Sequence, residues 1–551
     1  MRRIGLSLLL ASTLVAGFAS AKSSDWRITQ PAWTDYHEQQ FGDFVAQIGR
    51  AVESRRCGTL AECLQSPANP YYSTDPAGIN YFSDCADLPY YLRTYFAWKN
   101  GLPFSFATNL RANPVPVDQQ SSEGQSNDIR YSKNGNYAVG RWDMIAYKGK
   151  FPNAISILNQ GMIDAISSGT FRMLGDTTQG TYTDLYPAKI QRGSIRPGTA
   201  IYDPNGHVAI IYKINDEGRI FYIDSHPDNS LTSGLYTSKF MRSNPRQGAG
   251  FKNFRPLTLV GATMDSTGAY IGGKIIAKTN AELSDYGLDQ YYGNQPDSSG
   301  DWRMGQFVLN GQKVNYYDYV QLKLTTGELH IDPLMDMKLM VQDICVALKD
   351  RVAAVDAART SGVYLKQHPD RLPDNIYGTS GEWEDYATSS RDARLKTSFV
   401  DLLNFAKKTM DQYSRGDRTL RYSGGNLAKD LFAVYAKEAM ACKFSYVISN
   451  GQTLVMNLEA ARQRLYNMSF DPYHCVELRW GARLPQELTA CPDGSNKKQW
   501  YNQEQWLRNQ TERRYDVKMN YSLDQLRGPM PGVGVANPQD VDIVGYLKGL
   551  M

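Results

Sequence analysis

The sequence has little net charge and few histidines. It contains 60 Lys and Arg residues, 56 Asp and Glu residues and 6 His residues. Without Arg2 and Arg3, which belong to a predicted leader, 58 basic residues face 56 acidic ones, a net charge near +2. This near balance argues against nucleic acid as a partner and against strong attraction to an anionic membrane surface.

Signatures of cofactor sites are also missing. The sequence contains no glycine-rich phosphate loop and no dinucleotide-binding fingerprint. The acidic run at 382–385 is typical of a solvated turn rather than of a metal site. Four histidines are scattered without metal-ligand spacing: His37, His330, His368 and His474. We therefore expect no cofactor and no metal ion.

Only the N-terminus carries a long apolar run. Arg2 and Arg3 precede an apolar stretch from Ile4 to Phe18, and the small residues Ala19-Ser20-Ala21 follow. This is the pattern of a secretory signal peptide cleaved after Ala21. The sequence therefore predicts a periplasmic or secreted protein with no integral membrane segment after signal cleavage.

Seven cysteines in an exported chain cannot all pair. The spacing suggests three disulfides, although six cysteines allow 15 connectivities. The suggested pairs are Cys57 with Cys63, Cys345 with Cys442, and Cys475 with Cys491. This pairing leaves Cys85 as the unpaired thiol.

The 530 residues after the leader are too many for one ordinary core, so two or three domains are expected. The expected divisions are a signal peptide at 1–21, a catalytic domain at 22–260, a β-rich connector at 261–331, a helical bundle at 332–527 and a loose tail at 528–551.

Apolar periodicity predicts the elements of the catalytic domain. Stripes at spacings of three and four indicate helices at 35–53 and 84–100. A β-branched run at 206–214 and a second strand at 219–224 flank turn residues and predict a hairpin. Further expectations are a long loop at 110–140, a helical insertion within 152–174 and a strand at 251–260. Four amphipathic stripes after residue 332, the last at 454–465, predict the bundle.

Cys85 has the best context for chemistry. It stands at the start of a predicted helix, where unpaired N–H groups favour a thiolate. His207 opens the first hairpin strand and can act as its base. Asp224 ends the second strand, 17 residues later, and can orient the imidazole. His226 is the competing third member.

Three segments resemble the NlpC-type cell-wall peptidases. Ser83-Asp84-Cys85-Ala86-Asp87-Leu88 is similar to their nucleophile motif, Arg196 to Tyr202 to their Pro-Gly-Asp-Leu strand, and Gly206 to Ile211 to their Gly-His-Val-Gly-Ile strand. The resemblance covers about 84–260. It implies a papain-like fold, Cys85 as nucleophile, His207 as base, and hydrolysis of peptide bonds in peptidoglycan.

The departures from that family keep a second family open. Asp87 replaces a glycine, Thr199 replaces an aspartate, and the gap between Cys85 and His207 is longer than those enzymes need. The order Cys, His, Asp also resembles a transglutaminase-like core.

The sequence thus predicts an α+β papain-like (NlpC/transglutaminase-like) catalytic domain and an all-α C-terminal helical bundle. The expected activity is an exported cysteine hydrolase that cleaves amide bonds through a thioester, with peptidoglycan or another peptide as substrate. The alternatives are a transglutaminase-like acyl transferase and a non-enzymatic scaffold or binding protein with a relict triad.

Overall fold

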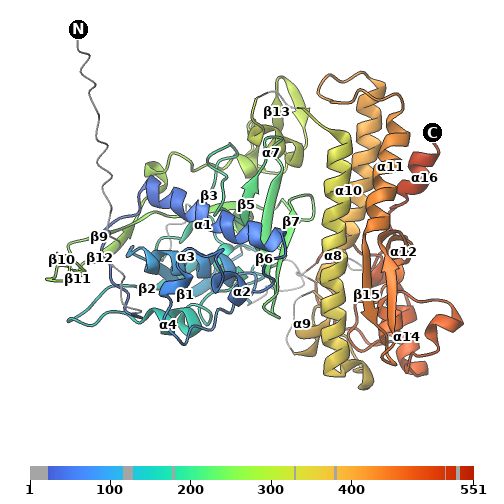
Figure 1. The fold of residues 1–551 in the computed structure, drawn as a ribbon, viewed down its shortest axis with the longest axis horizontal. Coiled ribbons are helices and arrows are strands. Elements are labelled where there is room, and N and C mark those ends of the chain that lie inside the picture. The colour runs from blue at the N-terminus through green and yellow to red at the C-terminus, as the bar shows by residue number, and fades with distance from the viewer. Residues whose placement is uncertain are drawn as a thin grey trace, which may run out of the picture.

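The computed structural model describes residues 23–115, 128–175, 180–242, 244–327, 330–377, 381–514, 517–528 and 534–551. The predicted signal peptide lies outside these residues. None of the described helices is long and apolar enough to cross a membrane. Two parts lie side by side (Figure 1): a sheet part, residues 23–327, and a helical part, residues 330–551.

The sheet part is built on six antiparallel strands in the order β3-β8-β4-β5-β6-β7. The hairpin predicted at 206–224 is confirmed as β5 and β6. The strands span Leu185–Pro187 (β3), Gly250–Phe254 (β8), Ala200–Asp203 (β4), His207–Ile214 (β5), Ile220–Ser225 (β6) and Leu231–Leu235 (β7).

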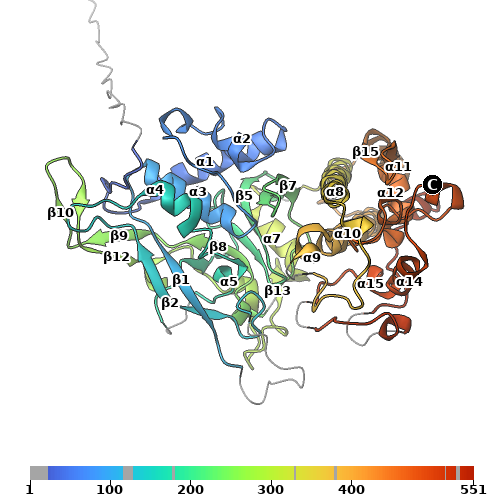
Figure 2. The ribbon, with the colours of Figure 1, turned by 90° about the horizontal axis from the view of Figure 1, so that it is seen from below.

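Successive side chains of β5 pack into two different hydrophobic cores, one on each face of the sheet. Val208 and Ile210 belong to a core that contains helices α1 (Asp35–Glu53) and α3 (Asp87–Lys99). Ala209 belongs to a different core that contains α7 (Tyr316–Leu324). Because successive side chains of a strand point to opposite faces, one strand serves two cores. Figure 2 shows α1 and α3 together on one side of β5.

The two predicted N-terminal helices are confirmed, and α1 has the predicted bounds. Helix α3 begins later and ends one residue earlier than the predicted 84–100. A short helix, α2 (Leu60–Leu64), lies in the disulfide-bonded loop between them.

Three local predictions need correction. The long loop predicted at 110–140 begins and ends in strands, β1 (Ser105–Ala112) and β2 (Asn136–Asp143), whose pairing supplies backbone hydrogen bonds. Its middle, 116–127, lies outside the described residues. The helical insertion is limited to α4 (Ala154–Ser156), a π-turn (Ile157–Gly161) and α5 (Ser168–Phe171). The single strand predicted at 251–260 is two, β8 and β9 (Leu257–Val260), which pair with different partners.

The predicted connector is part of the sheet part. Its strand β12 (Lys274–Ala277) pairs with β9, so the predicted boundary at 260 runs through a small sheet. Helix α7 covers one face of the large sheet. The remaining elements are β10 (Thr263–Met264), β11 (Tyr270–Ile271), α6 (Asp289–Tyr292), β13 (Phe307–Leu309) and β14 (Gln312–Val314).

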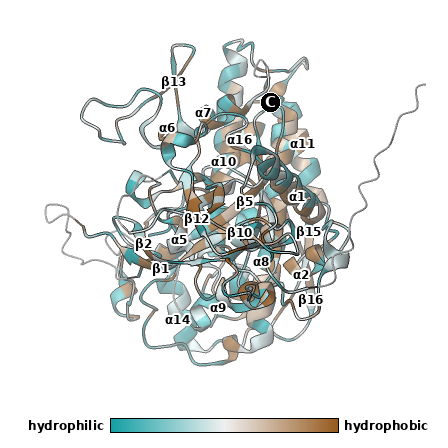
Figure 3. Cartoon of the chain, turned by 90° about the vertical axis from the view of Figure 1, so that its left-hand side faces the viewer, coloured by the Kyte–Doolittle hydropathy of each residue, from teal (hydrophilic) through white to brown (hydrophobic). Residues whose placement is uncertain are grey.

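The helical part surrounds a core shared by three long helices. These are α8 (Pro333–Ser361), α10 (Ser389–Ser414) and α11 (Leu427–Ala441). Helix α8 faces β7 and forms the seam with the sheet part (Figure 1). The shorter helices are α9 (Glu382–Tyr386), α12 (Leu458–Arg464), α13 (Val476–Arg479), α14 (Ser495–Gln503), α15 (Gln505–Arg508) and α16 (Ile543–Lys548). In Figure 3 the loops around β13 are mostly hydrophilic, and hydrophobic residues gather in the helices and strands.

Two predictions for this part are wrong. It is not all-α, because β15 (Lys443–Val447) and β16 (Thr453–Asn457) form a hairpin whose second strand occupies the start of the helix predicted at 454–465. The segment 528–551 is not simply a loose tail, since α16 buries Ile543 and Leu547 in the helical core. Residues 529–533 lie outside the described residues.

The cysteine geometry agrees with the suggested pairing. The disulfides join Cys57 to Cys63, Cys345 to Cys442, and Cys475 to Cys491. Cys345 and Cys442 connect α8 to the end of α11. Cys85 is the free cysteine among the described residues.

Candidate functional site

Cys85 lies in the turn that starts α3. The Asp84 carbonyl accepts a helical hydrogen bond from Leu88 N–H at 3.1 Å. The Asp84 carboxylate accepts from the N–H groups of Ala86 and Asp87 at 2.8 and 2.9 Å. The Asp84 side chain therefore satisfies two N–H groups in the turn that leads into the helix. The Cys85 N–H has no hydrogen-bond partner among the described residues.

Two serines hold this turn against the sheet. Ser225, the last residue of β6, donates its hydroxyl to the Ser83 carbonyl at 2.6 Å, and the two hydroxyl oxygens are 3.1 Å apart. Both side chains are buried. Because Ser225 follows Asp224 directly, this contact fixes Cys85 relative to the strand that carries the predicted third member of the triad.

The Cys85 sulfur lies against the backbone on both sides of His207. Its thiol donates a long hydrogen bond to the Gly206 carbonyl at 3.8 Å, and the Val208 N–H hydrogen-bonds to the sulfur. The sulfur therefore lies beside the backbone at the start of β5, next to His207, and no hydrogen bond joins it to the His207 ring among the described residues.

His207 is paired with Asp224, as the sequence predicts. His207 Nε2 lies 2.8 Å from Asp224 Oδ2, and both side chains are almost fully buried. The other oxygen of Asp224 accepts a short hydrogen bond from Thr232, its direct partner on β7. This network fixes the ring of His207 and leaves Nδ1 for a second partner.

His226 does not take the third position. Its ring stacks beside that of His207, with centroids 6.4 Å apart, but its Nε2 lies 3.3 Å from the hydroxyl oxygen of Thr232. Burial and the positive charge of Arg391 lower the pKa of His226 to about 3. It is therefore a neutral neighbour of the pair.

The thiol is neutral at rest, which corrects one sequence argument. Burial and the Asp84 carboxylate raise the pKa of Cys85 well above its ordinary value, against the opposing Val208 N–H. The helix start was expected to lower this pKa. Burial first, and then the negative charge of Asp84 at the helix N-terminus, reverse that expectation for the pKa of Cys85.

His207 is neutral as well, and so is suited to accept a proton. Burial and the positive charge of Arg394 lower its pKa, while the hydrogen bond to Asp224 opposes the shift. Burial opposes ionisation of Asp224, but the hydrogen bond with His207, the nearby His226 and the Thr232 hydroxyl hold its pKa well below the usual range. The site thus combines a thiol, a neutral base and an anionic orienting group.

Cys85 and His207 open into one cavity of about 240 Å³, the site cavity. The sheet part supplies one side of it, including Arg130 and Tyr131. The helical part supplies the other side. Its lining residues there are Ile376, Tyr377, Trp383, Glu384, Ala387, Ser389, Ser390, Arg391 and Arg394. The helical part is therefore a wall of the site and not a separate appendage.

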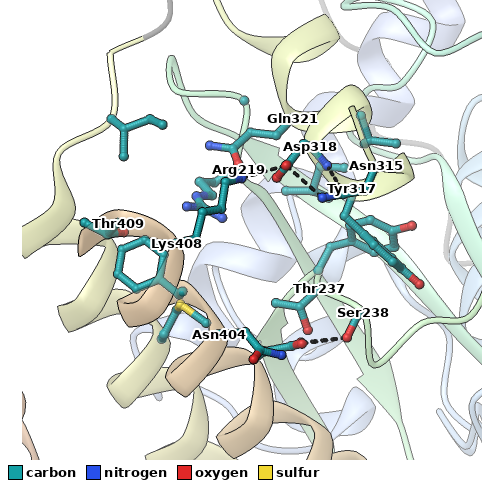
Figure 4. A pocket seen from close by; sticks show the side chains of 18 of the residues that line it. Arg219, Thr237, Ser238, Asn315, Tyr317, Asp318, Gln321, Asn404, Lys408 and Thr409 are labelled. Atoms are coloured by element: carbon teal, nitrogen blue, oxygen red, sulfur yellow. Dashed lines mark hydrogen bonds and ion pairs between the residues drawn. The ribbon is translucent and has the colours of Figure 1, made fainter. Parts of the chain in front are cut away.

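Another cavity, of about 250 Å³, lies elsewhere on the seam between the two parts. Figure 4 shows that its charged and polar side chains largely satisfy one another. Lys408 pairs with Asp318 at 2.6 Å, and Ser238 donates to Asp401 at 2.7 Å. None of the predicted site residues lines this cavity.

Sequence reasoning missed several groups at the site. The supporting residues Thr232 and Ser225 carry no motif of their own, and Ser83 stands in the quoted nucleophile motif without an assigned role. Arg391 and Arg394 come from α10, more than 160 residues after His207, and a single sequence gives no sign that α10 approaches the hairpin. The Thr232 position follows only from the register of β6 and β7.

Comparisons of the chain with family models, with curated proteins and with solved structures gave no match.

Proposed function

We propose that the protein is a cysteine hydrolase of amide bonds, with Cys85 as nucleophile, His207 as base and Asp224 as the group that orients the base. The observation that carries the proposal is the convergence of three elements on one cavity. The thiol contacts the backbone around His207, and His207 is bonded to Asp224 at 2.8 Å. A thiol, a neutral base and an orienting carboxylate beside one cavity are the groups that nucleophilic catalysis needs.

The chemistry follows from the neutral resting state. His207 Nδ1 takes the thiol proton as the Cys85 sulfur attacks the amide carbonyl, and a carbon–sulfur bond forms. The unpartnered Cys85 N–H can donate to the developing oxyanion. The protonated imidazole then gives its proton to the leaving amine as the carbon–nitrogen bond breaks. Water attacks the thioester, loses a proton to His207, and releases the carboxylic acid and the thiol.

The walls of the site cavity favour a polar peptide substrate. They include serine and tyrosine hydroxyls, the carboxylate of Glu384 and the guanidinium groups of Arg391 and Arg394. Such walls suit peptide backbone and carboxylate groups. The resemblance to NlpC-type enzymes adds peptidoglycan stem peptides as the first substrate to test, and the predicted leader places that substrate in the protein's compartment.

The test is cleavage of muropeptides by the purified chain, followed by mass spectrometry of the products. We expect new amino and carboxyl termini in the wild type and none in Cys85→Ala. His226→Ala is the matched control, because it alters the same neighbourhood without removing a proposed catalytic group. Cleavage by Cys85→Ala at the wild-type rate would refute the proposal.

Adding a primary amine to the reaction separates hydrolysis from acyl transfer. A cross-linked amide as the main product would replace the hydrolase by a transglutaminase-like acyl transferase with the same thioester. No turnover of any peptide, together with a Cys85 thiol that is inert to alkylation in the native protein, would instead favour a scaffold.

A further inference from the structure

We propose that His368, Asp471 and Glu504 bind a divalent transition-metal ion, with Zn²⁺ as the first candidate. His368 follows a short 3₁₀ turn (Val363–Leu365), Asp471 precedes α13, and Glu504 lies between α14 and α15. One donor atom from each side chain lies within 4.8 Å of the other two. The cluster is inside the helical part and is distinct from the cysteine site.

The hydrogen bonds of His368 leave its second nitrogen facing a carboxylate. Its Nδ1 lies 2.6 Å from the Pro369 carbonyl, so Nδ1 carries a proton and donates. Its Nε2 lies 2.8 Å from Asp471 Oδ2. Because Nδ1 is the donor to the carbonyl, either a proton or a metal ion must lie between Nε2 and the carboxylate of Asp471. Trp500 stacks on the ring at 4.1 Å and fixes its plane.

The carboxylate of Glu504 also points to a bound ligand. Its side chain is fully buried, and both carboxylate oxygens lack a hydrogen-bond partner among the described residues. The nearest cation is Arg508, whose Nη1 is 4.0 Å away. The guanidinium of Arg508 instead donates to the Tyr501 carbonyl and to Gln505 Oε1. An unsatisfied buried carboxylate is costly, so this geometry calls for a ligand.

His474 is close to the cluster, but its nitrogens are already used. Its Nδ1 lies 2.7 Å from the Ser469 hydroxyl and its Nε2 lies 3.1 Å from the Lys497 carbonyl. The ring is within 3.9 Å of Glu504 and 3.7 Å of Asp471. His474 therefore lines the cluster without offering a free donor atom.

The donor set suits a divalent ion. One imidazole and two carboxylates match Zn²⁺ and neighbouring transition metals, and two carboxylates would balance the charge of the ion. The outer contacts are also in place. His368 donates to a backbone carbonyl, and Asp471 Oδ1 accepts from Tyr473 N–H at 2.7 Å.

The position of the cluster gives the ion a structural role. His368 begins the segment 368–377, which leads to Ile376 and Tyr377 in the wall of the site cavity. Glu504 lies in the joint between α14 and α15. An ion held by both would tie that wall to the interior of the helical part. The ligands come from distant stretches of chain, which is why their spacing in the sequence shows no metal motif.

The test is metal analysis of the full chain without its leader, purified without chelators or affinity metals. We expect one Zn²⁺ per chain, loss of the ion to a strong chelator with a lower melting temperature, and recovery of both on adding Zn²⁺. Co²⁺ added to the stripped protein should give the visible absorption of a bound ion with nitrogen and oxygen ligands.

Glu504→Gln is the decisive variant because it keeps the size of the side chain but removes the negative charge and one ligand oxygen. We expect Zn²⁺ affinity to fall by about 100-fold or more, the upper range for losing even an outer contact. Glu477→Gln is the matched control. Glu477 is equally buried in the helical part, but its carboxylate is satisfied by Ser449, so metal binding should be unchanged.

A proton shared between Asp471 and Glu504 is the competing explanation. It predicts a folded wild type that contains no metal, binds no added Zn²⁺, Mn²⁺ or Fe²⁺, and keeps its melting temperature in chelator. That result would overturn the proposal. If Glu504→Gln does not fold, the metal content and chelator response of the wild type still decide between the two.

Discussion

Among the described residues, two buried His–Asp pairs share the same short distance but have different surroundings. His207 and Asp224 in the sheet part, and His368 and Asp471 in the helical part, are each 2.8 Å apart from Nε2 to Oδ2. The first pair opens into a cavity beside a thiol. The second is closed in and faces another carboxylate, Glu504. The group next to each His–Asp pair, a thiol in one case and a carboxylate in the other, determines the chemistry that the pair can support.

The nearest charges differ as well. Arg394 helps to lower the pKa of His207, so that imidazole is poised to accept a proton from Cys85. His368 instead has Nδ1 committed to a backbone carbonyl. A base in catalysis must exchange protons with a substrate, whereas a metal ligand needs a fixed lone pair. The two pairs meet these separate needs.

The largest expected effect is the loss of activity in Cys85→Ala. Removing the nucleophile should reduce amide cleavage by roughly 10⁴-fold or more, since triad groups act as a unit. The melting temperature should stay within a few degrees of the wild type, because Cys85 forms no disulfide. Steady-state cleavage and a thermal melt of the same preparation measure both quantities.

Matched substitutions in the two pairs should separate catalysis from stability. His207→Ala should reduce cleavage by about 10³-fold or more, and it should also destabilise the fold because Asp224 is left buried without its partner. His368→Ala should mainly lower the free energy of unfolding, by about 3–5 kcal/mol, because Asp471 is left buried without its partner. Denaturant unfolding and cleavage assays on both variants give the comparison. Equal loss of activity and equal destabilisation in the two variants would refute the assigned roles.

Asp224→Asn should weaken activity less than loss of the base. The amide can still accept from His207, but the charge that stabilises the protonated imidazole is gone, and we expect about a 10²-fold loss of kcat. Asp228→Asn is the control, since Asp228 binds Ser230 in the adjacent turn and not His207. A kcat within twofold of wild type for Asp224→Asn would remove Asp224 from the mechanism.

The disulfide that closes the longer loop should stabilise more than the short one. Replacing Cys345 and Cys442 by Ala should lower the free energy of unfolding by about 2–4 kcal/mol, since that bridge closes a loop of 97 residues. The Cys57–Cys63 bridge closes only 6 and should contribute less. Denaturant unfolding of the two double variants measures the difference, and the reverse order would contradict it.

The smallest expected effect is a shift in pH dependence. His207 must be neutral to act as base, and its pKa is lowered, so kcat/KM should fall on the acid side only below about pH 6.5. Arg394→Gln removes a positive charge that disfavours protonation of His207. The pKa of His207 then rises, and the acid limb should move to higher pH. An acid limb that stays in place would show that Arg394 does not act on His207.

Local patterns predicted much of the sheet part. The apolar stripe of α1 gave its bounds, and the β-branched run from Val208 to Ile211 gave β5 and the hairpin. The hairpin in turn placed His207 near Asp224. The cysteine count left Cys85 unpaired because six others had partners at plausible spacings.

The remaining features depend on contacts between distant segments. The expected thiolate at Cys85 failed because burial and the capping carboxylate of Asp84 are properties of the folded site. Strand β16 was predicted as part of a helix because it directly precedes α12 in the sequence. Alternation of apolar and polar residues over only five positions is hard to distinguish from a helical stripe. The wall formed by α10 and the cluster around Glu504 require the tertiary fold itself.

The most direct test of the central claim is a search for an acyl adduct on Cys85. Wild type and His207→Ala are mixed with muropeptides, quenched in acid and digested, and the Cys85 peptide is examined by mass spectrometry. If Cys85 is the nucleophile and His207 its base, we expect a thioester on Cys85 in the wild type and little or none in His207→Ala. Cleavage products that form without any adduct, and that form equally in Cys85→Ala, would contradict it.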